Sequence, residues 1–301
     1  MAVVATSATE RTVTGPPDFT YVTLHDREIA YRESPGSGPT LLLIHGVGGS
    51  ATDWDRTIPL LAAADAHVIT VDLPGHGRSD KRRGDYSLGA MASTLRDLLD
   101  HLSVDRVVLV GHSLGGGISL QFIYQFPQRA HGLVLVSSGG LGDETPTWLR
   151  AATLPGANYA LAAVGSRQTT ATLSWLTKQL HRLHITEEFF TDESLARLAE
   201  FSDPLLRNAF LATLRSVVDV NGQRVSALGK LPALGPMPVL LIWGAMDPLM
   251  PVSHGHNAVE QLENARLVIF PRVGHEPHIA DPQRFAQLVL DYRTELVANP
   301  T

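Results

Sequence analysis

Six continuous apolar segments, most of them separated by segments of helical periodicity, constrain the fold of this chain more than any other feature. They are LLLIH (41–45), HVITVD (67–72), RVVLVG (106–111), GLVLVS (132–137), VLLIWG (239–244) and RLVIF (266–270). Strands without polar alternation are buried on both faces, which is typical of a parallel sheet covered by crossover helices. Helical spacing is found at 53–63, 87–102, 114–126, 253–262 and 282–297. The sequence therefore predicts an α/β fold with a mostly parallel central sheet.

Two segments interrupt this alternation. Near the N-terminus, FTYVTLH and REIAYRES flank a turn at His25-Asp26 and predict an antiparallel hairpin. Between the fourth and fifth apolar segments we expect helices and no strand, because the patterns there are amphipathic: TWLRAATL, TATLSWLTKQLHRL, SLARLAEF and LRNAFLATLRSVV. We therefore predict a helical cap, or lid, at 139–234, inserted into a core formed by 19–138 and 235–301. Residues 1–18 are expected to form a disordered tail.

Composition argues against several classes of function. The chain of 301 residues has a net charge of −6 and no long basic segment, so nucleic acid is not an expected partner. It has no Cys, which excludes disulfides, thiolate nucleophiles and cysteine metal sites. No apolar run approaches the ~20 residues of a membrane span, and the N-terminal residues do not resemble a signal peptide. We expect a cytoplasmic location; the oligomeric state stays open, a homo-oligomer included.

The apolar segment at 106–111 ends in a turn, GHSLG, where one serine stands between two glycines. If a strand ends at Gly111 and a helix begins near Leu114, Ser113 must adopt a sparsely allowed backbone conformation, which small neighbours permit. The turn places Ser113 at the carboxyl end of the sheet, where open α/β sheets bind ligands. The N–H at the start of the helix favours a negative oxygen beside the serine. We therefore interpret Ser113 as a nucleophile.

GHSLG resembles the G-x-S-x-G nucleophile elbow of the α/β-hydrolases, and further motifs follow the expected strands in the order of that family. They are HGVGGS (45–50), similar to the oxyanion loop, DLPGHGRSD (72–80), GAMDP (244–248) and VGHEPH (273–278). The resemblance covers roughly residues 20 to 297. It implies the α/β-hydrolase fold with an inserted helical cap and a catalytic triad of Ser113, Asp247 and His275.

The resemblance gives each of these residues a chemical role. A serine hydroxyl is a poor nucleophile until a base removes its proton, and His275 is the candidate base because imidazole titrates near neutrality. Asp247 would accept a hydrogen bond from the other ring nitrogen. The backbone N–H groups of Val47 and Leu114 would form the oxyanion hole. Candidate substrate-binding residues are Gly46, in that loop, and Trp54, just past it; the alternative for Trp54 is packing of its helix against the core.

Other polar residues have simpler interpretations. Asp72 belongs to the turn after the fourth strand and is expected to be structural, while Asp143 follows the sixth strand several residues too late to be the triad acid. His45 and His112 are expected to hold neighbouring loops by hydrogen bonds. The remaining His pairs have no accompanying carboxylate cluster, so we expect no metal. GVGG lacks the Lys-Ser/Thr of a P-loop, and we expect no cofactor.

A serine nucleophile leaves several reactions open: acyl transfer to water from an ester or thioester, C–C bond hydrolysis, cofactor-free haloperoxidase activity and a lyase reaction. HGLVLVSSGG (131–140) also resembles the C–C hydrolases of aromatic ring-cleavage pathways, but the oxyanion loop and the residues after His275 depart from their pattern. A cap rich in Leu, Ala and Trp favours a small-to-medium, mainly apolar substrate. We predict a carboxylic ester hydrolase that forms an acyl-enzyme; the alternatives are a C–C hydrolase and a slow-turnover ligand-binding protein.

Overall fold

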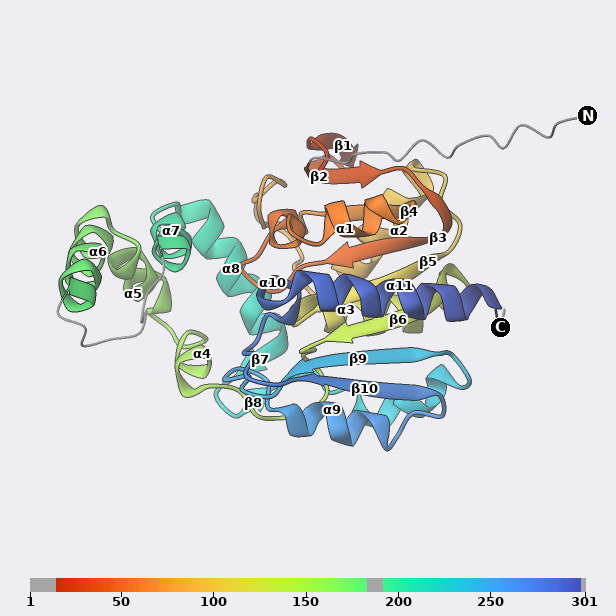
Figure 1. Cartoon of the computed structure of the whole chain (residues 1–301). Coiled ribbons are helices and arrows are strands. Elements are labelled where there is room, and N and C mark those ends of the chain that lie inside the picture. Colours follow the sequence, from red (N-terminus) through yellow and green to blue (C-terminus); the bar gives the residue numbers. More distant parts are fainter. Residues whose placement is uncertain (1–14, 183–191, 299–301) are drawn as a thin grey trace, which may run out of the picture.

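The computed structural model describes residues 15–182 and 192–298, so residues 1–14 of the expected tail lie outside the described residues. Its centre is an eight-stranded sheet (Figure 1). The strands are β1 (Thr20–Leu24), β2 (Arg27–Ser34), β3 (Ser37–Ile44), β4 (Ala66–Val71), β5 (Val107–His112), β6 (Ala130–Val136), β9 (Val239–Gly244) and β10 (Ala265–Phe270). Their spatial order is β1-β2-β4-β3-β5-β6-β9-β10. The first two neighbouring pairs, β1–β2 and β2–β4, are antiparallel and all others are parallel. The antiparallel hairpin and the mostly parallel sheet agree with the prediction from the sequence.

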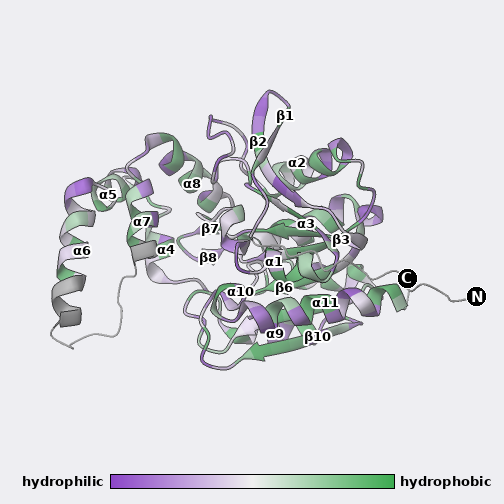
Figure 2. Ribbon diagram, turned by 45° about the horizontal axis from the view of Figure 1, so that its top comes forward, coloured by the Kyte–Doolittle hydropathy of each residue, from purple (hydrophilic) through white to green (hydrophobic). Residues whose placement is uncertain are grey.

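The inner parallel strands are buried on both faces, whereas the edge strand β10 is mostly half-buried. Along β3, Leu42 and Ile44 belong to one hydrophobic cluster, whereas Leu41 and Leu43 belong to the cluster on the opposite face. This alternation follows from the two-residue period of a strand, and it explains why the strands have continuous apolar sequences. Figure 2 shows the apolar character of the strands in the hydrophobic colouring of β6 and β10, against the mixed colouring of α11 (Pro282–Ala298).

Helices cover both faces of the sheet. Residues of α2 (Leu88–His101), α3 (Leu114–Gln125) and α9 (Val252–Val259) join the cluster that contains Leu42. Residues of α1 (Ile58–Ala63) and α11 join the cluster that contains Leu41. The remaining short helices of this part are η1 (Ala51–Trp54), η2 (Pro127–Arg129) and α10 (Pro277–Ala280). The result is the three-layered α/β architecture that the alternation of strands and helices predicts.

The residues between β6 and β9 form a separate group of helices. They are α4 (Thr147–Ala151), α5 (Ala157–Val164), α6 (Arg167–Arg182), α7 (Asp192–Glu200), α8 (Pro204–Val217) and η3 (Leu228–Leu234). Figures 1 and 2 show α5, α6 and α7 projecting to one side of the sheet. The expectation that this segment holds no strand was wrong. The strands β7 (Val218–Asp219) and β8 (Gly222–Gln223), of two residues each, pair as an antiparallel hairpin. None of the helices in the two described ranges is long and apolar enough to cross a membrane.

Candidate active site

The turn between β5 and α3 gives Ser113 its position. Ser113 is the N-cap of α3 and has φ 53° and ψ −114°, in the region that L-residues rarely adopt. A Cβ added at Gly111 would lie 2.3 Å from the carbonyl oxygen of Gly115, and one added at Gly115 would lie 2.3 Å from that of Ile44. Larger residues at these two positions would therefore push α3 away from β3 and β5. The two glycines let the helix start directly behind the serine.

Asp247 lies in the turn after β9, and its side chain is 0% exposed. Its Oδ2 accepts a hydrogen bond from His275 Nδ1–H at 2.8 Å. Its Oδ1 accepts hydrogen bonds from the backbone N–H groups of Leu249 and Met250, at 2.8 and 2.9 Å. Burial alone would favour the neutral carboxyl, but the hydrogen bond and charge of His275 and the two backbone donors outweigh it and lower the pKa of Asp247. The carboxylate is thus ionised and fixed.

The histidine loop after β10 is held from the opposite side by β5. His112 Nε2–H donates to the backbone carbonyl of His275 at 2.9 Å. The two imidazole rings lie 4.7 Å apart, centroid to centroid. Full burial, followed by the positive charges that His278 and His275 can carry, holds the pKa of His112 well below its usual range, so His112 is neutral. These contacts match the expectation that His112 holds a neighbouring loop.

Ser113, His275 and the loop after β3 line one cavity of about 310 Å³. Ser113 Oγ and His275 Nε2 have no direct hydrogen bond in the structure, although both residues are described; such bonds are often long without a bound substrate. Gly46 and Val47 lie on the wall beside the serine, and a Cβ added at Gly46 would be 3.2 Å from Ser113 Cβ. The structure therefore brings together the serine, the histidine–aspartate pair and the loop that the sequence singled out.

Two backbone N–H groups beside Ser113 are free to bind an oxygen. Leu114 is the first residue of α3, so its N–H has no acceptor within the helix. The Val47 N–H has no acceptor among residues 15–182 and 192–298. The preceding carbonyl, of Gly46, accepts hydrogen bonds from His45 Nδ1–H at 2.7 Å and from Gly49 N–H at 3.1 Å. Because the peptide unit is planar, fixing the Gly46 carbonyl also fixes the direction of the Val47 N–H.

Of the two candidate substrate-binding residues, the structure places Gly46 at the cavity and Trp54 in the core. Gly46 lines the cavity. Trp54 is 0% exposed and stacks on His278 with ring centroids 4.3 Å apart, in the hydrophobic cluster between the sheet, α1 and α11. Its placement in η1 turns the side chain inward to the core rather than into the cavity.

The two rival carboxylates lie elsewhere. Asp72 is fully buried and accepts the backbone N–H groups of Ala51 and Arg78, each at 2.6 Å, so it ties the loop after β3 to the turn after β4. That is the structural role expected of it. Asp143 is exposed, and its backbone carbonyl pairs with Gln223. Among the described residues, no group of three or more His, Asp and Glu side chains could hold a metal ion.

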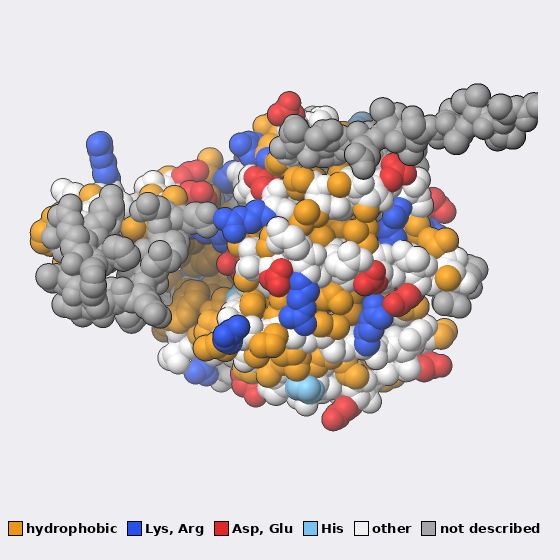
Figure 3. Space-filling view, in the orientation of Figure 1, with side chains coloured by type: hydrophobic (Ala, Val, Ile, Leu, Met, Phe, Trp, Pro, Cys, Tyr) orange, Lys and Arg blue, Asp and Glu red, His pale blue; other side chains and the backbone are white. Residues whose placement is uncertain are grey.

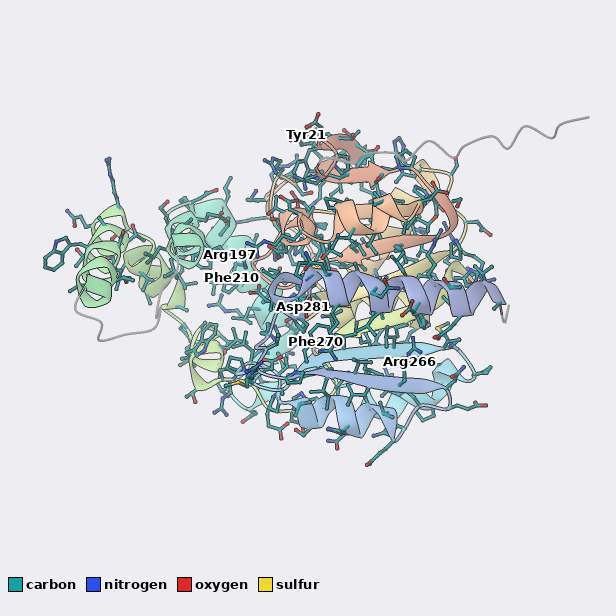
Figure 4. All side chains as sticks on the ribbon, viewed as in Figure 1. Tyr21, Arg197, Phe210, Arg266, Phe270 and Asp281 are labelled. Carbon is teal, nitrogen blue, oxygen red and sulfur yellow. The ribbon has the colours of Figure 1, made fainter. Side chains whose placement is uncertain are left out.

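Charged residues at the cavity rim were not anticipated from the sequence. Arg197 of α7 pairs with Asp53 Oδ1 at 2.9 Å and with Glu276 Oε1 at 3.5 Å, which connects the inserted helices to two core loops. Figure 4 shows Arg197 beside Phe210 where these helices meet the core. Both residues also border a second, more polar cavity of about 620 Å³. Glu276 follows His275 directly, but no pattern in the sequence marks Arg197 as its partner.

Known proteins resemble this chain over most of its length. The alpha/beta hydrolase fold family model matches residues 39–282. An uncharacterised protein of Mycobacterium tuberculosis (strain ATCC 25618 / H37Rv) is 40% identical over 276 residues, 91% of this chain and 80% of that protein. The 2-hydroxy-6-oxo-6-phenylhexa-2,4-dienoate hydrolase of Burkholderia cepacia is 29% identical over 286 residues, 90% of this chain and 95% of that protein.

A solved structure agrees with these sequence relatives. The structure titled "Est816 as an N-Acyl homoserine lactone degrading enzyme" has a TM-score of 0.69 and 28% sequence identity to this chain. The match covers 91% of this chain and 100% of that one. With its sheet order, its serine turn and these matches, the chain belongs to the α/β-hydrolase fold family and is a hydrolase.

Proposed function

We propose that this protein hydrolyses a carboxylic ester through an acyl-enzyme formed on Ser113. The observation that carries the proposal is the cavity that Ser113 shares with His275, whose ring is held by the buried carboxylate of Asp247 at 2.8 Å. A carboxylate in this position fixes the tautomer of the imidazole, leaving Nε2 unprotonated and able to act as a base. It also stabilises the imidazolium that forms when the base takes a proton.

The proposed reaction has two halves. In the first, His275 Nε2 takes the proton of Ser113 Oγ as the oxygen bonds to the ester carbon, and the carbonyl oxygen becomes an oxyanion. The N–H groups of Val47 and Leu114 bind that oxyanion; one such donor is typically worth about 3–4 kcal/mol in the transition state. The bond to the alcohol oxygen then breaks as the imidazolium returns the proton to it.

In the second half, water replaces the alcohol. His275 Nε2 takes a proton from the water as its oxygen attacks the acyl carbon, and the same two N–H groups bind the second oxyanion. The Ser113 oxygen then leaves with the proton, which releases the carboxylic acid. No cofactor enters either half of this scheme.

The lining of the cavity supports a small-to-medium, mainly apolar acyl group. Side chains from the core and from the inserted helices line it, and most are apolar, among them Leu88, Leu114, Leu149, Phe210, Leu214 and Val217. Figure 3 shows hydrophobic side chains in the hollow where the inserted helices meet the core. We propose that residues 139–234 act as the cap of the site, because α4 and α8 supply part of this lining.

A second candidate reaction is C–C bond hydrolysis. It is favoured by the similarity, over 95% of its length, to the Burkholderia cepacia hydrolase named for 2-hydroxy-6-oxo-6-phenylhexa-2,4-dienoate. The Est816 structure, named for N-acyl homoserine lactone degradation, favours the ester reaction, because a lactone is a cyclic ester. The same serine, histidine and aspartate would serve either reaction, so a comparison of substrates is needed to distinguish the two.

The experiment is a comparison of kcat/KM on p-nitrophenyl butyrate and on 2-hydroxy-6-oxo-6-phenylhexa-2,4-dienoate, for the wild type and Ser113→Ala. We expect hydrolysis of the ester by the wild type and a loss of about 10⁴-fold or more in the variant. A larger kcat/KM on the dienoate would favour the C–C reaction instead. Absence of turnover on both substrates would overturn the enzyme proposals in favour of a ligand-binding protein.

A further inference from the structure

The cavity beside Ser113 extends along one face of α3. Leu114, Gly117, Gln121 and Tyr124 all line it, at the three- and four-residue spacing that places side chains on the same face of a helix. Ser113 stands at the start of this face and Tyr124 three turns later, a rise of about 16 Å at about 1.5 Å per residue. We call the part of the cavity along this face, from Ser113 to Tyr124, the channel.

Tyr124 brings an unused hydrogen-bond donor to the far end of this channel. Its hydroxyl oxygen is buried and has no hydrogen-bond partner in the structure. Buried tyrosine hydroxyls usually have one, so this hydroxyl would gain its missing partner from a ligand if the tyrosine side chain turned toward the cavity that the residue lines. Burial raises the pKa of Tyr124 to about 12, so the hydroxyl keeps its proton and remains a donor.

Lys230 brings a positive charge to the same end. It lines the channel from η3, and its Nζ lies 5.9 Å from the centroid of the Tyr124 ring. Within the described part of the chain, no carboxylate lies within 4 Å of this ammonium group. The neighbouring lining residues on this side are apolar or neutral, namely Leu88, Leu120, Gln121 and Ala227. Lys230 is therefore an exposed cation at the edge of the channel, without a carboxylate partner among the described residues.

The Ser113 end, in contrast, has two carboxylates and one guanidinium group. Asp53 and Glu276 line the cavity there, and both pair with Arg197. An anionic substrate group would meet two carboxylates at that end, but an ammonium group and a hydroxyl donor at the other. The distribution of charge thus favours an anion at the far end alone.

We propose that Lys230 and Tyr124 bind a carboxylate at the far end of an acyl chain whose ester carbonyl lies at Ser113. This rests on the proposed ester hydrolysis and names its substrate class: half-esters of medium-length aliphatic dicarboxylic acids. The methylene chain would lie along Leu114, Gly117 and Leu120, and the alcohol would leave on the side of the polar cavity beyond Arg197 and Phe210.

The test compares esters that differ only in the terminal group. The substrates are the p-nitrophenyl monoesters of suberic and sebacic acids, each against p-nitrophenyl octanoate or decanoate of the same chain length. We expect the wild type to prefer the carboxylate esters by about tenfold in kcat/KM, the size of a charge-assisted hydrogen bond. Lys230→Met should remove this preference, Lys230→Arg should keep most of it, and Tyr124→Phe should reduce it severalfold.

A matched control removes the same charge elsewhere. Lys81 borders the polar cavity and its Nζ donates to the backbone carbonyl of Ser79, so Lys81→Met should leave the preference unchanged. Equal kcat/KM for both ester types in the wild type would overturn the proposal. So would an unchanged preference in Lys230→Met, or the same loss in Lys81→Met.

Binding separates this proposal from ester hydrolysis itself. Titration calorimetry of sebacate into Ser113→Ala, and into the same variant carrying Lys230→Met, needs no turnover. If the wild type hydrolyses none of the esters, the proposed function fails, while affinity about tenfold weaker in the double variant still supports the carboxylate site. Equal affinity, or no binding to either protein, overturns the site whatever the enzyme hydrolyses.

Discussion

The two ends of the cavity differ in how their polar groups are held. At the Ser113 end, the carboxylate of Asp247 accepts three hydrogen bonds and the Gly46 carbonyl accepts two, all from loops of the core. At the far end, the Tyr124 hydroxyl has no partner and Lys230 is exposed. Fixed groups suit a reaction whose charges develop at set positions, whereas groups free to bind a ligand suit recognition. We therefore propose that the core carries the chemistry and that the far end of the channel gives the selectivity.

Substitution of the buried carboxylate should have the largest effect. In Asp247→Asn the side chain no longer favours the imidazole tautomer that leaves Nε2 as a base, so we expect kcat to fall by about 10³–10⁴-fold. The measurement is kcat on p-nitrophenyl butyrate. Asp143→Asn is the matched control, because Asp143 is exposed and is not among the residues that line the cavity. An equal loss in that variant would contradict the assignment of the acid.

A side chain that blocks the channel between its two ends should lower kcat/KM for long acyl chains more than for short ones. A Cβ at Gly117 would meet no atom closer than 3.8 Å, so the backbone tolerates a side chain there, but that side chain would extend into the cavity between Ser113 and Tyr124. We expect Gly117→Leu to lower kcat/KM on p-nitrophenyl decanoate by roughly 10- to 100-fold, a loss of about 1.4–2.8 kcal/mol in transition-state binding. The acetate ester should be hydrolysed within about threefold of the wild-type rate.

Gly116 is the neighbouring control for this variant. A Cβ at Gly116 would lie 2.1 Å from Ser138 Oγ, against the core, so Gly116→Ala should lower the free energy of unfolding without changing the ratio of the two esters. If Gly117→Leu lowers kcat/KM equally on p-nitrophenyl acetate and p-nitrophenyl decanoate, the acyl chain does not lie along α3.

Buried histidines beneath the Ser113 end should make stability depend on pH. His278 is fully buried with both ring nitrogens unpartnered, and burial, followed by the charges of His275 and Arg197, lowers its pKa to about 3. An unfolded histidine titrates near 6.5, so between these values the unfolded state binds the extra proton. The free energy of unfolding therefore falls as pH drops below about 6.5, by up to about 1.4 kcal/mol per pH unit for this residue.

Replacing His278 should reduce that dependence. We expect His278→Phe, which keeps a ring against Trp54 and Phe285, to flatten the slope of the unfolding free energy between about pH 4 and pH 6. Urea denaturation at each pH gives the slope. His101→Gln, at an exposed position of α2, is the control; the same flattening there would contradict the assignment to His278.

The sheet could be predicted from the sequence because strands that are buried on both faces have continuous apolar sequences. Each apolar segment became a strand within a few residues, and the least accurate boundary was β3, which begins at Ser37 rather than Leu41. Ser37–Thr40 carries no apolar pattern, and the pairing with β4 shifts register between Ser37 and Leu41. The triad candidates could be found because each follows a strand end, and parallel strands bring their carboxyl ends to one edge.

The far wall of the cavity could not be predicted in the same way. Trp54 illustrates the difficulty, because the sequence allows an aromatic residue just past the loop after β3 to face either the cavity or the core. In the structure it packs on His278, in the core. Tyr124 and Lys230 come from α3 and η3, which lie far apart in the chain and meet only in the fold. Their pairing depends on tertiary packing, which no local pattern records.

The most direct test of the account is whether Ser113 is an activated nucleophile. The measurement is the intact mass of the wild type, Ser113→Ala and Ser93→Ala after incubation with a fluorophosphonate; Ser93, on α2, is the control serine. We predict a single adduct in the wild type and in Ser93→Ala, and none in Ser113→Ala. An adduct that persists in Ser113→Ala, or a wild type that hydrolyses p-nitrophenyl butyrate without forming one, would contradict the central claim.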